Sequence, residues 1–206
     1  MILLRSLVFQ IYLYISILCA SILVVLSFPL PYSMKFSIAR KWGASMLWIG
    51  EKLCNIRFVV EGQENIPLKP SVIMIKHSSV FEAYAQLVVF PEQTWVVKKE
   101  LQWIPIFGWA LHALNAICIN RKSGRTAVTQ VIEEGKMRLK SGIWVTIFPE
   151  GTRMKPGETK KFGISGAALA KAANVDIVPV AHNAEDVWES HSLEKKPGYV
   201  RFCIGK

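Results

Sequence analysis

The residues best suited to proton-transfer chemistry in this sequence are His77 and Glu82, in the segment Lys-His-Ser-Ser-Val-Phe-Glu. His77 follows the apolar run Val72–Ile75, which predicts a place near a strand end, where functional groups of α/β sheets collect. If Glu82 lies in the first turn of a following helix, its carboxylate folds back onto the imidazole. It would then fix the tautomer of His77 and stabilise the imidazolium that forms during proton transfer.

The same segment also has a structural interpretation. Ser79 and Glu82 spell Ser-x-x-Glu, a capping box in which the glutamate bonds the backbone N–H of the serine. A single histidine at a strand end is more often a structural residue than a base, and short motifs match by chance. The residues alone therefore leave both interpretations open.

A second candidate is the segment Phe-Pro-Glu-Gly-Thr-Arg, which also follows an apolar run. Pro149 and Gly151 predict a turn that leaves Glu150, Thr152 and Arg153 on a loop at the sheet edge. The guanidinium of Arg153 can donate two parallel hydrogen bonds to a phosphate. The alternative is an ordinary exposed turn with solvated charges.

Arg121 is the third candidate, because it ends the strand-like run Ala116–Asn120. His77, Arg121 and Arg153 then follow three predicted strands, whose carboxyl ends meet at one edge of a parallel sheet. A base beside two phosphate-binding cations predicts a site for a phosphorylated alcohol.

The elements that must position these residues are predicted by the alternation of short apolar runs with helical patterns. This alternation predicts an α/β fold with a mostly parallel sheet flanked by helices. Because a strand-like run ends almost at the last residue, we expect either a truncated C-terminus or the absence of a short final element. The expected strands are Arg57–Val60, Val72–Ile75, Trp95–Val97, Ala116–Asn120, Trp144–Phe148, Asp176–Ala181 and Val200–Ile204. Helices are expected over Gly124–Lys140, over Ile164–Ala172 and after Ser79, and loops over Glu61–Pro70 and Glu189–Gly198.

The N-terminal part of the chain predicts an anchor. No charged residue occurs between Arg5 and Lys35, and Leu7–Leu30 is long enough to cross a bilayer. A cleaved signal peptide is the alternative, but its apolar region is normally shorter. We therefore expect a membrane-embedded helical segment within residues 1–54, followed by an α/β domain over residues 55–206.

The cations after the anchor, Lys35, Arg40 and Lys41, predict that the α/β domain lies at the cytoplasmic face of the inner or plasma membrane. Pro29 and Pro31 break the chain between two helices, so a hairpin that dips into one leaflet is an alternative to a spanning helix.

The second of these helices is predicted to be amphipathic. Trp42, Met46, Ile49 and Leu53 recur at helical spacing, which is typical of a helix at a membrane surface. An ordinary core helix has the same periodicity and remains the alternative.

Composition narrows the class of partner. Lys and Arg number 25 against 15 Asp and Glu, so the net charge is +10 and an anionic partner is expected. Seven Trp and a mean hydropathy of +0.30 favour an anionic membrane surface over nucleic acid. The four cysteines lack Cys-x-x-Cys spacing, so we expect reduced structural thiols, with Cys118 and Cys203 buried in strands, and no metal site.

With these motifs, the sequence resembles the glycerolipid acyltransferase superfamily, and specifically the 1-acyl-glycerol-3-phosphate acyltransferases. That family is marked by His-x4-Asp, a strand ending in Arg, Phe-Pro-Glu-Gly-Thr-Arg, and an apolar strand with Pro. The order and spacing match over residues 55–185, although Glu82 stands where the family has Asp. The corresponding segments are His77–Glu82, Ile119–Arg121, Phe148–Arg153 and Val175–Val180.

The resemblance implies that His77 is a general base with Glu82 as its partner. It implies an acyl-CoA or acyl carrier protein donor, a lysophosphatidic acid acceptor, phosphatidic acid as product, and no cofactor or metal. Because no Gly-x-Ser-x-Gly nucleophile is present, the acceptor's own hydroxyl is expected to attack the thioester. The residues implied in binding the glycerol phosphate are Arg121, Glu150, Gly151, Thr152 and Arg153.

Other functions remain open on the sequence. The acceptor could be another lysolipid or glycerol 3-phosphate. A membrane-anchored thioesterase would use water as the acceptor, although the two phosphate-suited cations argue against it. A non-catalytic lipid-binding protein would use Glu82 only as a helix cap.

Overall fold

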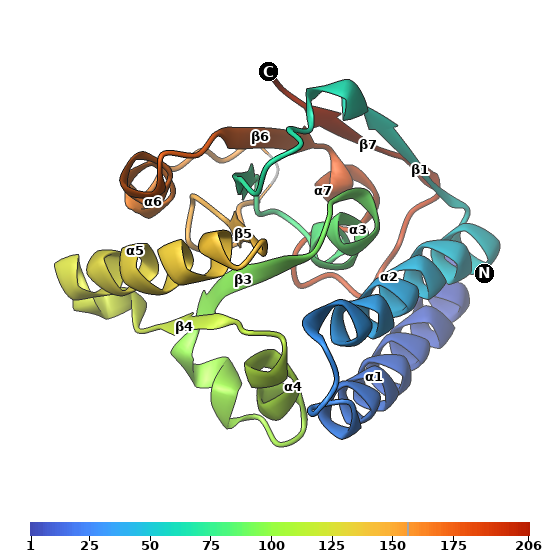
Figure 1. Ribbon diagram of the computed structural model, residues 1–206. Coiled ribbons are helices and arrows are strands. Elements are labelled where there is room, and N and C mark those ends of the chain that lie inside the picture. Colours follow the sequence, from blue (N-terminus) through green and yellow to red (C-terminus); the bar gives the residue numbers. More distant parts are fainter. Residues whose placement is uncertain (156) are drawn as a thin grey trace.

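The computed structural model describes residues 1–155 and 157–206, which form a mixed seven-stranded β-sheet with helices on both faces (Figure 1). The strand order is β1-β7-β6-β2-β5-β3-β4, and each neighbouring pair is parallel except β6 with β7. The strands are β1 (Ile56–Glu61), β2 (Val72–Ile75), β3 (Gln93–Lys98), β4 (Ile117–Ile119), β5 (Trp144–Ile147), β6 (Ile177–His182) and β7 (Gly198–Ile204).

The predicted α/β fold is confirmed, because every expected strand is present and each bound differs from the expectation by at most two residues. The expected helices also occur, as α3 (Phe81–Val89), α5 (Arg125–Lys140) and α6 (Ser165–Ala173). Two helices were missed because they are too short to show a helical period, namely α4 (Phe107–Ala113) and α7 (Ala184–Val187). Short 3₁₀ segments are η1 (Gln63–Asn65), η2 (Lys99–Trp103) and η3 (Arg121–Ser123).

The strands differ in how their two faces are covered. Every residue of β5 is buried, as expected for a central parallel strand with helices on both faces. In β6, buried and exposed residues alternate, with Val178, Val180 and His182 on the buried side. The other side of β6, which carries Ile177, Pro179 and Ala181, faces outward and becomes part of a groove described below.

The N-terminal helices α1 (Ile2–Leu26) and α2 (Tyr32–Cys54) form a hairpin beside the sheet (Figure 1). The break between them falls at the two prolines, as predicted, and Pro31 directly precedes α2. Helix α2 packs closely on α3 at Gly43, where an added Cβ would lie 2.7 Å from the carbonyl oxygen of Tyr84. Among the described residues, α1 is the one helix whose length and composition would allow it to cross a membrane.

The amphipathic face of α2 packs inside the protein. Met46 is fully buried, and Trp42 donates a hydrogen bond of 3.0 Å from Nε1 to Oγ of Ser16 in α1. The core-helix alternative therefore describes this face, and a membrane contact of α2 stays a prediction. Because α1, α2 and the sheet share one hydrophobic core, the division between residues 54 and 55 also stays a prediction.

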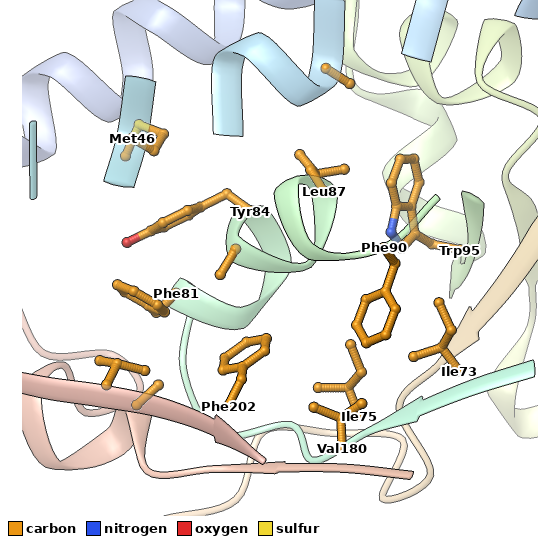
Figure 2. Packing of buried hydrophobic residues seen from close by; sticks show 14 of the residues in the cluster. Met46, Ile73, Ile75, Phe81, Tyr84, Leu87, Phe90, Trp95, Val180 and Phe202 are labelled. Carbon is orange, nitrogen blue, oxygen red and sulfur yellow. The ribbon is translucent and has the colours of Figure 1, made fainter. Parts of the chain in front are cut away.

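Helix α3 is the centre of that core (Figure 2). Its apolar face lies between α2 and the sheet, and the rings of Phe81 and Tyr84 are 5.0 Å apart. Burying a large apolar side chain contributes about 1.5–3 kcal/mol, so several such residues hold α3 firmly in place. Glu82, in the first turn of α3, is therefore carried by a well-anchored helix.

The expectation that Cys203 is buried is wrong. Residues of β7 alternate between the two faces, and Cys203 lies on the exposed side, where Sγ donates to Oε2 of Glu61 at 3.4 Å. Cys118 is half-buried. All four cysteines lie among the described residues and are free thiols, as expected.

Candidate active site

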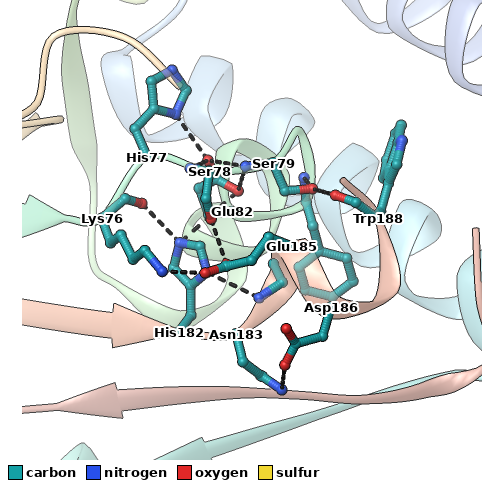
Figure 3. A network of polar contacts seen from close by, with 12 residues as sticks. Lys76, His77, Ser78, Ser79, Glu82, His182, Asn183, Glu185, Asp186 and Trp188 are labelled. Atoms are coloured by element: carbon teal, nitrogen blue, oxygen red, sulfur yellow. Dashed lines mark hydrogen bonds and ion pairs between the residues drawn. The ribbon is translucent and has the colours of Figure 1, made fainter. Parts of the chain in front are cut away.

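His77 and Glu82 meet at the carboxyl end of β2. Strand β2 ends at Ile75 and α3 begins at Phe81, so a short turn lies between the two residues. Nδ1 of His77 lies 2.8 Å from Oε1 of Glu82 (Figure 3). Glu82 is fully buried, whereas the side chain of His77 is 14% exposed. The structure therefore provides the contact that the sequence required, a carboxylate in the first helical turn that folds back onto the ring.

The carboxylate of Glu82 also accepts the backbone N–H of Ser79, which is the contact expected of a capping box, so the two interpretations of the motif are not exclusive. Oε1 accepts backbone N–H groups from Ser78 at 3.1 Å and from Ser79 at 3.0 Å. These donors compensate a buried carboxylate, which accepts hydrogen bonds and has none to donate. We therefore assign the proton of the neutral His77 ring to Nδ1, which leaves the lone pair on Nε2.

The ring of His77 is held by a second contact. It stacks on Phe148, with ring centroids 4.2 Å apart and an interplanar angle of 26°. The nitrogen that does not face Glu82 points away from the polar network (Figure 3). An oriented imidazole with a lone pair on Nε2 and a carboxylate on Nδ1 can accept a proton from a hydroxyl group.

The loop from Phe148 to Arg153 is bound to the backbone of His77 on both sides. The N–H of His77 donates to Oε2 of Glu150 at 3.3 Å, and the N–H of Met154 donates to the carbonyl of His77 at 2.8 Å. Gly151 has a φ of +69°, which a glycine adopts without strain and which lets the loop turn back. The loop predicted from the sequence therefore lies directly at His77.

Arg121 joins this loop from β4. Its Nη1 donates to the carbonyl of Gly151, and burial lowers the pKa of Arg121 from its ordinary value. Thr152 and Arg153 are exposed on the same loop. Arg121 is thus bound to the loop that carries Arg153, and the sequence had predicted both residues at one edge of the sheet. Their role in phosphate binding stays a prediction.

Two residues at the site, His182 and Glu185, were not predicted from the sequence, although the position of His182 was recognisable. His182 ends the apolar strand β6, as His77 follows β2, and that parallel could have identified it. Its Nε2 lies 2.7 Å from the carbonyl oxygen of Lys76, and its Nδ1 accepts the N–H of Ala184 at 3.2 Å. His182 therefore ties the ends of β6 and β2 together beside His77.

Glu185 gave no such signal, because it lies in the short helix α7. Its carboxylate accepts hydrogen bonds from Nζ of Lys76 and, at 2.6 Å, from Oγ of Ser78 (Figure 3). Burial alone would raise the pKa of Glu185, but the hydrogen bonds from Lys76 and Ser78 outweigh it and hold the pKa below its ordinary value.

A groove of about 800 Å³ lies along the outward side of β6, next to the loop. One part of it is lined by Lys76, the residue before His77, and by Glu150, which accepts a hydrogen bond from the N–H of His77. The remaining lining is largely apolar and includes Met74, Met154, Phe162, Ile177, Pro179 and Ala181.

Comparison with known proteins identifies the family of this chain. Residues 57–183 match the Acyltransferase family. A 1-acyl-sn-glycerol-3-phosphate acyltransferase of Pseudomonas aeruginosa is 39% identical over 177 residues, which cover 85% of this chain and 69% of that protein. The human beta form is 30% identical over 131 residues, which cover 63% of this chain and 47% of that protein. A solved 1-acyl-sn-glycerophosphate acyltransferase from Thermotoga maritima has a TM-score of 0.79 at 23% identity, over 99% of this chain and 84% of that chain.

This chain therefore belongs to the acyltransferase family, and within that family of enzymes to the 1-acyl-sn-glycerol-3-phosphate acyltransferases. The match to the Thermotoga structure shows that the fold is shared. The chain spans about half the length of the human relative. All seven site residues predicted from the sequence lie within residues 57–183, whereas Glu185 lies just beyond them.

Proposed function

We propose that this chain transfers a fatty acyl group from acyl-CoA or acyl carrier protein to the free hydroxyl of 1-acyl-glycerol 3-phosphate, giving phosphatidic acid. The observation that carries the proposal is the 2.8 Å contact between Nδ1 of His77 and Oε1 of Glu82, with the cationic loop bound to the same histidine. The names of the relatives support lysophosphatidic acid as the acceptor.

In the proposed mechanism His77 is the general base. Nδ1 donates to Glu82 and leaves Nε2 to accept the proton of the acceptor hydroxyl as its oxygen attacks the thioester carbonyl. The resulting imidazolium is stabilised by the buried carboxylate of Glu82. When the tetrahedral intermediate collapses, the C–S bond breaks and Nε2 returns the proton to the leaving thiolate. Holding donor and acceptor together in this geometry supplies much of the rate.

The loop is proposed to bind the acceptor's phosphate. Arg153 and Thr152 are exposed and can donate to phosphate oxygens, and Arg121 has further guanidinium donors besides the one on Gly151. Glu150 contributes by fixing the loop to the N–H of His77, and Gly151 by permitting the turn. The phosphate would thus be bound within the structure that also holds the base.

The groove along β6 is proposed to hold an acyl chain. Its lining is largely apolar, it is open to solvent along the exposed side of the strand, and its volume of about 800 Å³ suits a long flexible chain. Because Lys76 and Glu150 line one part of it, a chain in the groove would reach the neighbourhood of His77.

The protein is proposed to act at the cytoplasmic face of the membrane, with the α1–α2 hairpin in one leaflet. The backbone N–H of Lys195 donates to Oγ of Ser6 at 2.9 Å, and its Nζ donates to Oε1 of Gln10 at 2.7 Å. These contacts tie the first turns of α1 to the loop before β7, which favours a hairpin over a spanning helix. Large apolar residues of α1 are exposed for lipid, among them Leu3, Leu7, Ile11, Ile15 and Leu18.

Purified protein assayed with paired donors and acceptors tests the proposal. We expect transfer from a long-chain thioester to lysophosphatidic acid, with release of one thiol for each phosphatidic acid formed. Lysophosphatidylcholine and glycerol 3-phosphate serve as alternative acceptors, and acyl-CoA is compared with acyl carrier protein as donor. Thioester loss at the same rate without any acceptor would contradict the proposal and indicate a thioesterase.

A further inference from the structure

The carboxylate of Glu185 holds the two residues that flank His77. It accepts from the ammonium of Lys76 at Oε1 and from the hydroxyl of Ser78 at Oε2, the latter at 2.6 Å (Figure 3). Glu185 is 8% exposed and Ser78 is fully buried. Because the side chains of both neighbours of His77 donate to one carboxylate, they bind the main chain at His77 to α7.

His182 reinforces this connection from the end of β6. Its Nδ1 accepts the N–H of Ala184, so the ring proton lies on Nε2, which donates to the carbonyl of Lys76. Lys76 is therefore held at its carbonyl by His182 and at its ammonium by Glu185. Nε2 of His182 lies 4.0 Å from Oε2 of Glu82, beyond hydrogen-bond distance, so the contacts of His182 fix Lys76 without using the Glu82 carboxylate.

We propose that Glu185 is a positioning residue for the His77–Glu82 pair. By bridging Lys76 and Ser78, it keeps His77 at the distance and orientation from Glu82 that proton transfer requires. The bridge also reaches Glu82, because the backbone N–H of Ser78 donates to Oε1 of that carboxylate at 3.1 Å. The inference rests on the proposed acyl transfer and adds to it a residue outside the segment that matches the family, 57–183.

The contacts predict a larger effect on turnover than on folding. Val187 and Trp188 are buried and anchor α7 and the residue after it independently of Glu185, and Oγ of Ser79 donates to the carbonyl of Trp188 at 2.7 Å. Loss of the bridge would thus leave α7 packed while freeing the segment around His77. A displacement of about 1 Å at a reacting group can cost on the order of a hundredfold in rate.

The first test compares Glu185→Gln with Glu185→Asp. Gln keeps the shape and can still accept from Ser78 but loses the charge that holds Lys76. We expect kcat to fall about tenfold or more, with the KM for lysophosphatidic acid changed less than about twofold. Asp restores the charge and should recover part of kcat. The matched control is Asp186→Asn, an exposed neighbour in α7 that accepts from Asn183 at 3.1 Å and should leave kcat unchanged.

A second test asks whether Glu185 acts through His77. In a His77→Ala background, Glu185→Gln should lower the residual rate no further, since residues that act as a unit are not additive. The smaller change Ser78→Ala removes one bond of the bridge and should give a smaller loss of the same kind. A Glu185→Gln enzyme with wild-type kcat, or one whose loss persists in full without His77, would overturn the inference.

A spectroscopic readout separates this inference from the proposed function, because it needs no substrate. In protein labelled with ¹⁵N-histidine, the Nδ1–H signal of His77, identified by its loss in His77→Ala, reports the hydrogen bond to Glu82. We expect that signal to shift or broaden in Glu185→Gln and to stay unchanged in Asp186→Asn. An unperturbed His77 signal in Glu185→Gln would overturn the positioning role, whichever acceptor the enzyme uses.

Discussion

The two sides of His77 are built differently. On the inner side lies the fully buried carboxylate of Glu82, which accepts hydrogen bonds from the ring and from two backbone N–H groups. On the outer side lies the loop with Arg153, whose cation is exposed to solvent. On the inner side, the hydrogen bonds of Glu82 are formed before any substrate binds. On the outer side, the exposed guanidinium of Arg153 can donate to a ligand. Under the proposed mechanism, this difference means that His77 is preorganised as the base and that substrate binding completes the site.

The same difference sets the expected size of mutational effects. Changing a buried, hydrogen-bonded charge alters the electrostatics around His77 and leaves the former partners of that charge unpaired, which is costly. An exposed cation is screened by water and salt, so its loss matters mainly when a ligand is bound. Substitutions on the inner side should therefore affect turnover, and those on the outer side should affect acceptor binding.

The largest effect is expected from Glu82→Gln on the inner side. Gln keeps an acceptor for the N–H groups of Ser78 and Ser79 but removes the charge that stabilises the imidazolium. We expect turnover to fall by orders of magnitude while the melting temperature changes little, by analogy with the neutralised carboxylate of a Ser-His-Asp triad. Turnover and thermal melting, measured side by side, check this.

Glu82→Asp is the control for charge at this position. Asp is the residue usual in the family, but here it must reach His77 from a backbone adjusted to Glu. We expect partial activity, above that of Gln. Near-normal turnover in Glu82→Gln would show that Glu82 serves only the capping box, because Gln can replace Glu there.

On the outer side, Arg153→Ala should raise the KM for lysophosphatidic acid about tenfold or more, since a charge-assisted contact contributes about 1.5–3 kcal/mol. Arg121→Ala should do the same and also lower thermal stability, because Nη1 of Arg121 holds the carbonyl of Gly151. Lys should rescue either variant poorly, because it lacks the planar fork of donors. An unchanged KM in both Ala variants would remove these residues from the phosphate site.

A smaller, substrate-dependent effect is expected in the groove. Ala181 lies on the outward side of β6 and lines the groove, so Ala181→Phe should shorten it. We expect turnover to fall several-fold with the longest acyl chains and little with short ones. Val59→Phe, on the exposed side of β1 and outside the groove lining, is the matched control. A uniform loss across chain lengths would contradict the acyl-chain assignment.

The smallest effect concerns another buried charge, Lys195, whose side-chain hydrogen-bond partners are neutral. Nζ donates to Gln10 and to the carbonyl of Leu193 and lies over the ring of Trp188. Burial lowers the pKa of Lys195 to about 8, which the nearby Cys54 offsets only in part. Between pH 8 and 10.5 the unfolded chain keeps the proton that the folded protein has lost, so the free energy of unfolding should rise with pH across this window.

Chemical unfolding at pH 8 and pH 10 checks this against Lys195→Met, which should lack the rise. Lys196→Met, an exposed neighbour, should behave as wild type. If the difference in unfolding free energy between wild type and Lys195→Met is the same at both pH values, the buried lysine does not titrate as described.

Sequence patterns predicted the parts of the site that depend on local order. The strands before His77, Arg121 and the Phe-Pro-Glu-Gly-Thr-Arg loop are short, apolar and followed by polar residues, so a parallel sheet brings their ends to one edge. The contact between Glu82 and His77 could also be predicted, because it requires only a turn followed by the start of a helix.

The remainder depends on contacts that no local pattern encodes. The bond from Ser78 to Glu185 joins residues 107 positions apart and comes from a helix of four residues. The exposure of Cys203 depends on which face of β7 is covered, which strand alternation alone cannot decide. Likewise, the sequence placed Arg121 at the right edge but could not show that one of its donors is used by Gly151.

The most direct test of the central claim, that His77 is the base of an acyl transfer, is the rate at which labelled acyl groups reach lysophosphatidic acid in wild type and in His77→Ala. We predict phosphatidic acid formation by the wild type and a loss of at least about a hundredfold in turnover for His77→Ala, with lysophosphatidic acid binding retained. Turnover in His77→Ala within a few-fold of wild type would contradict the account.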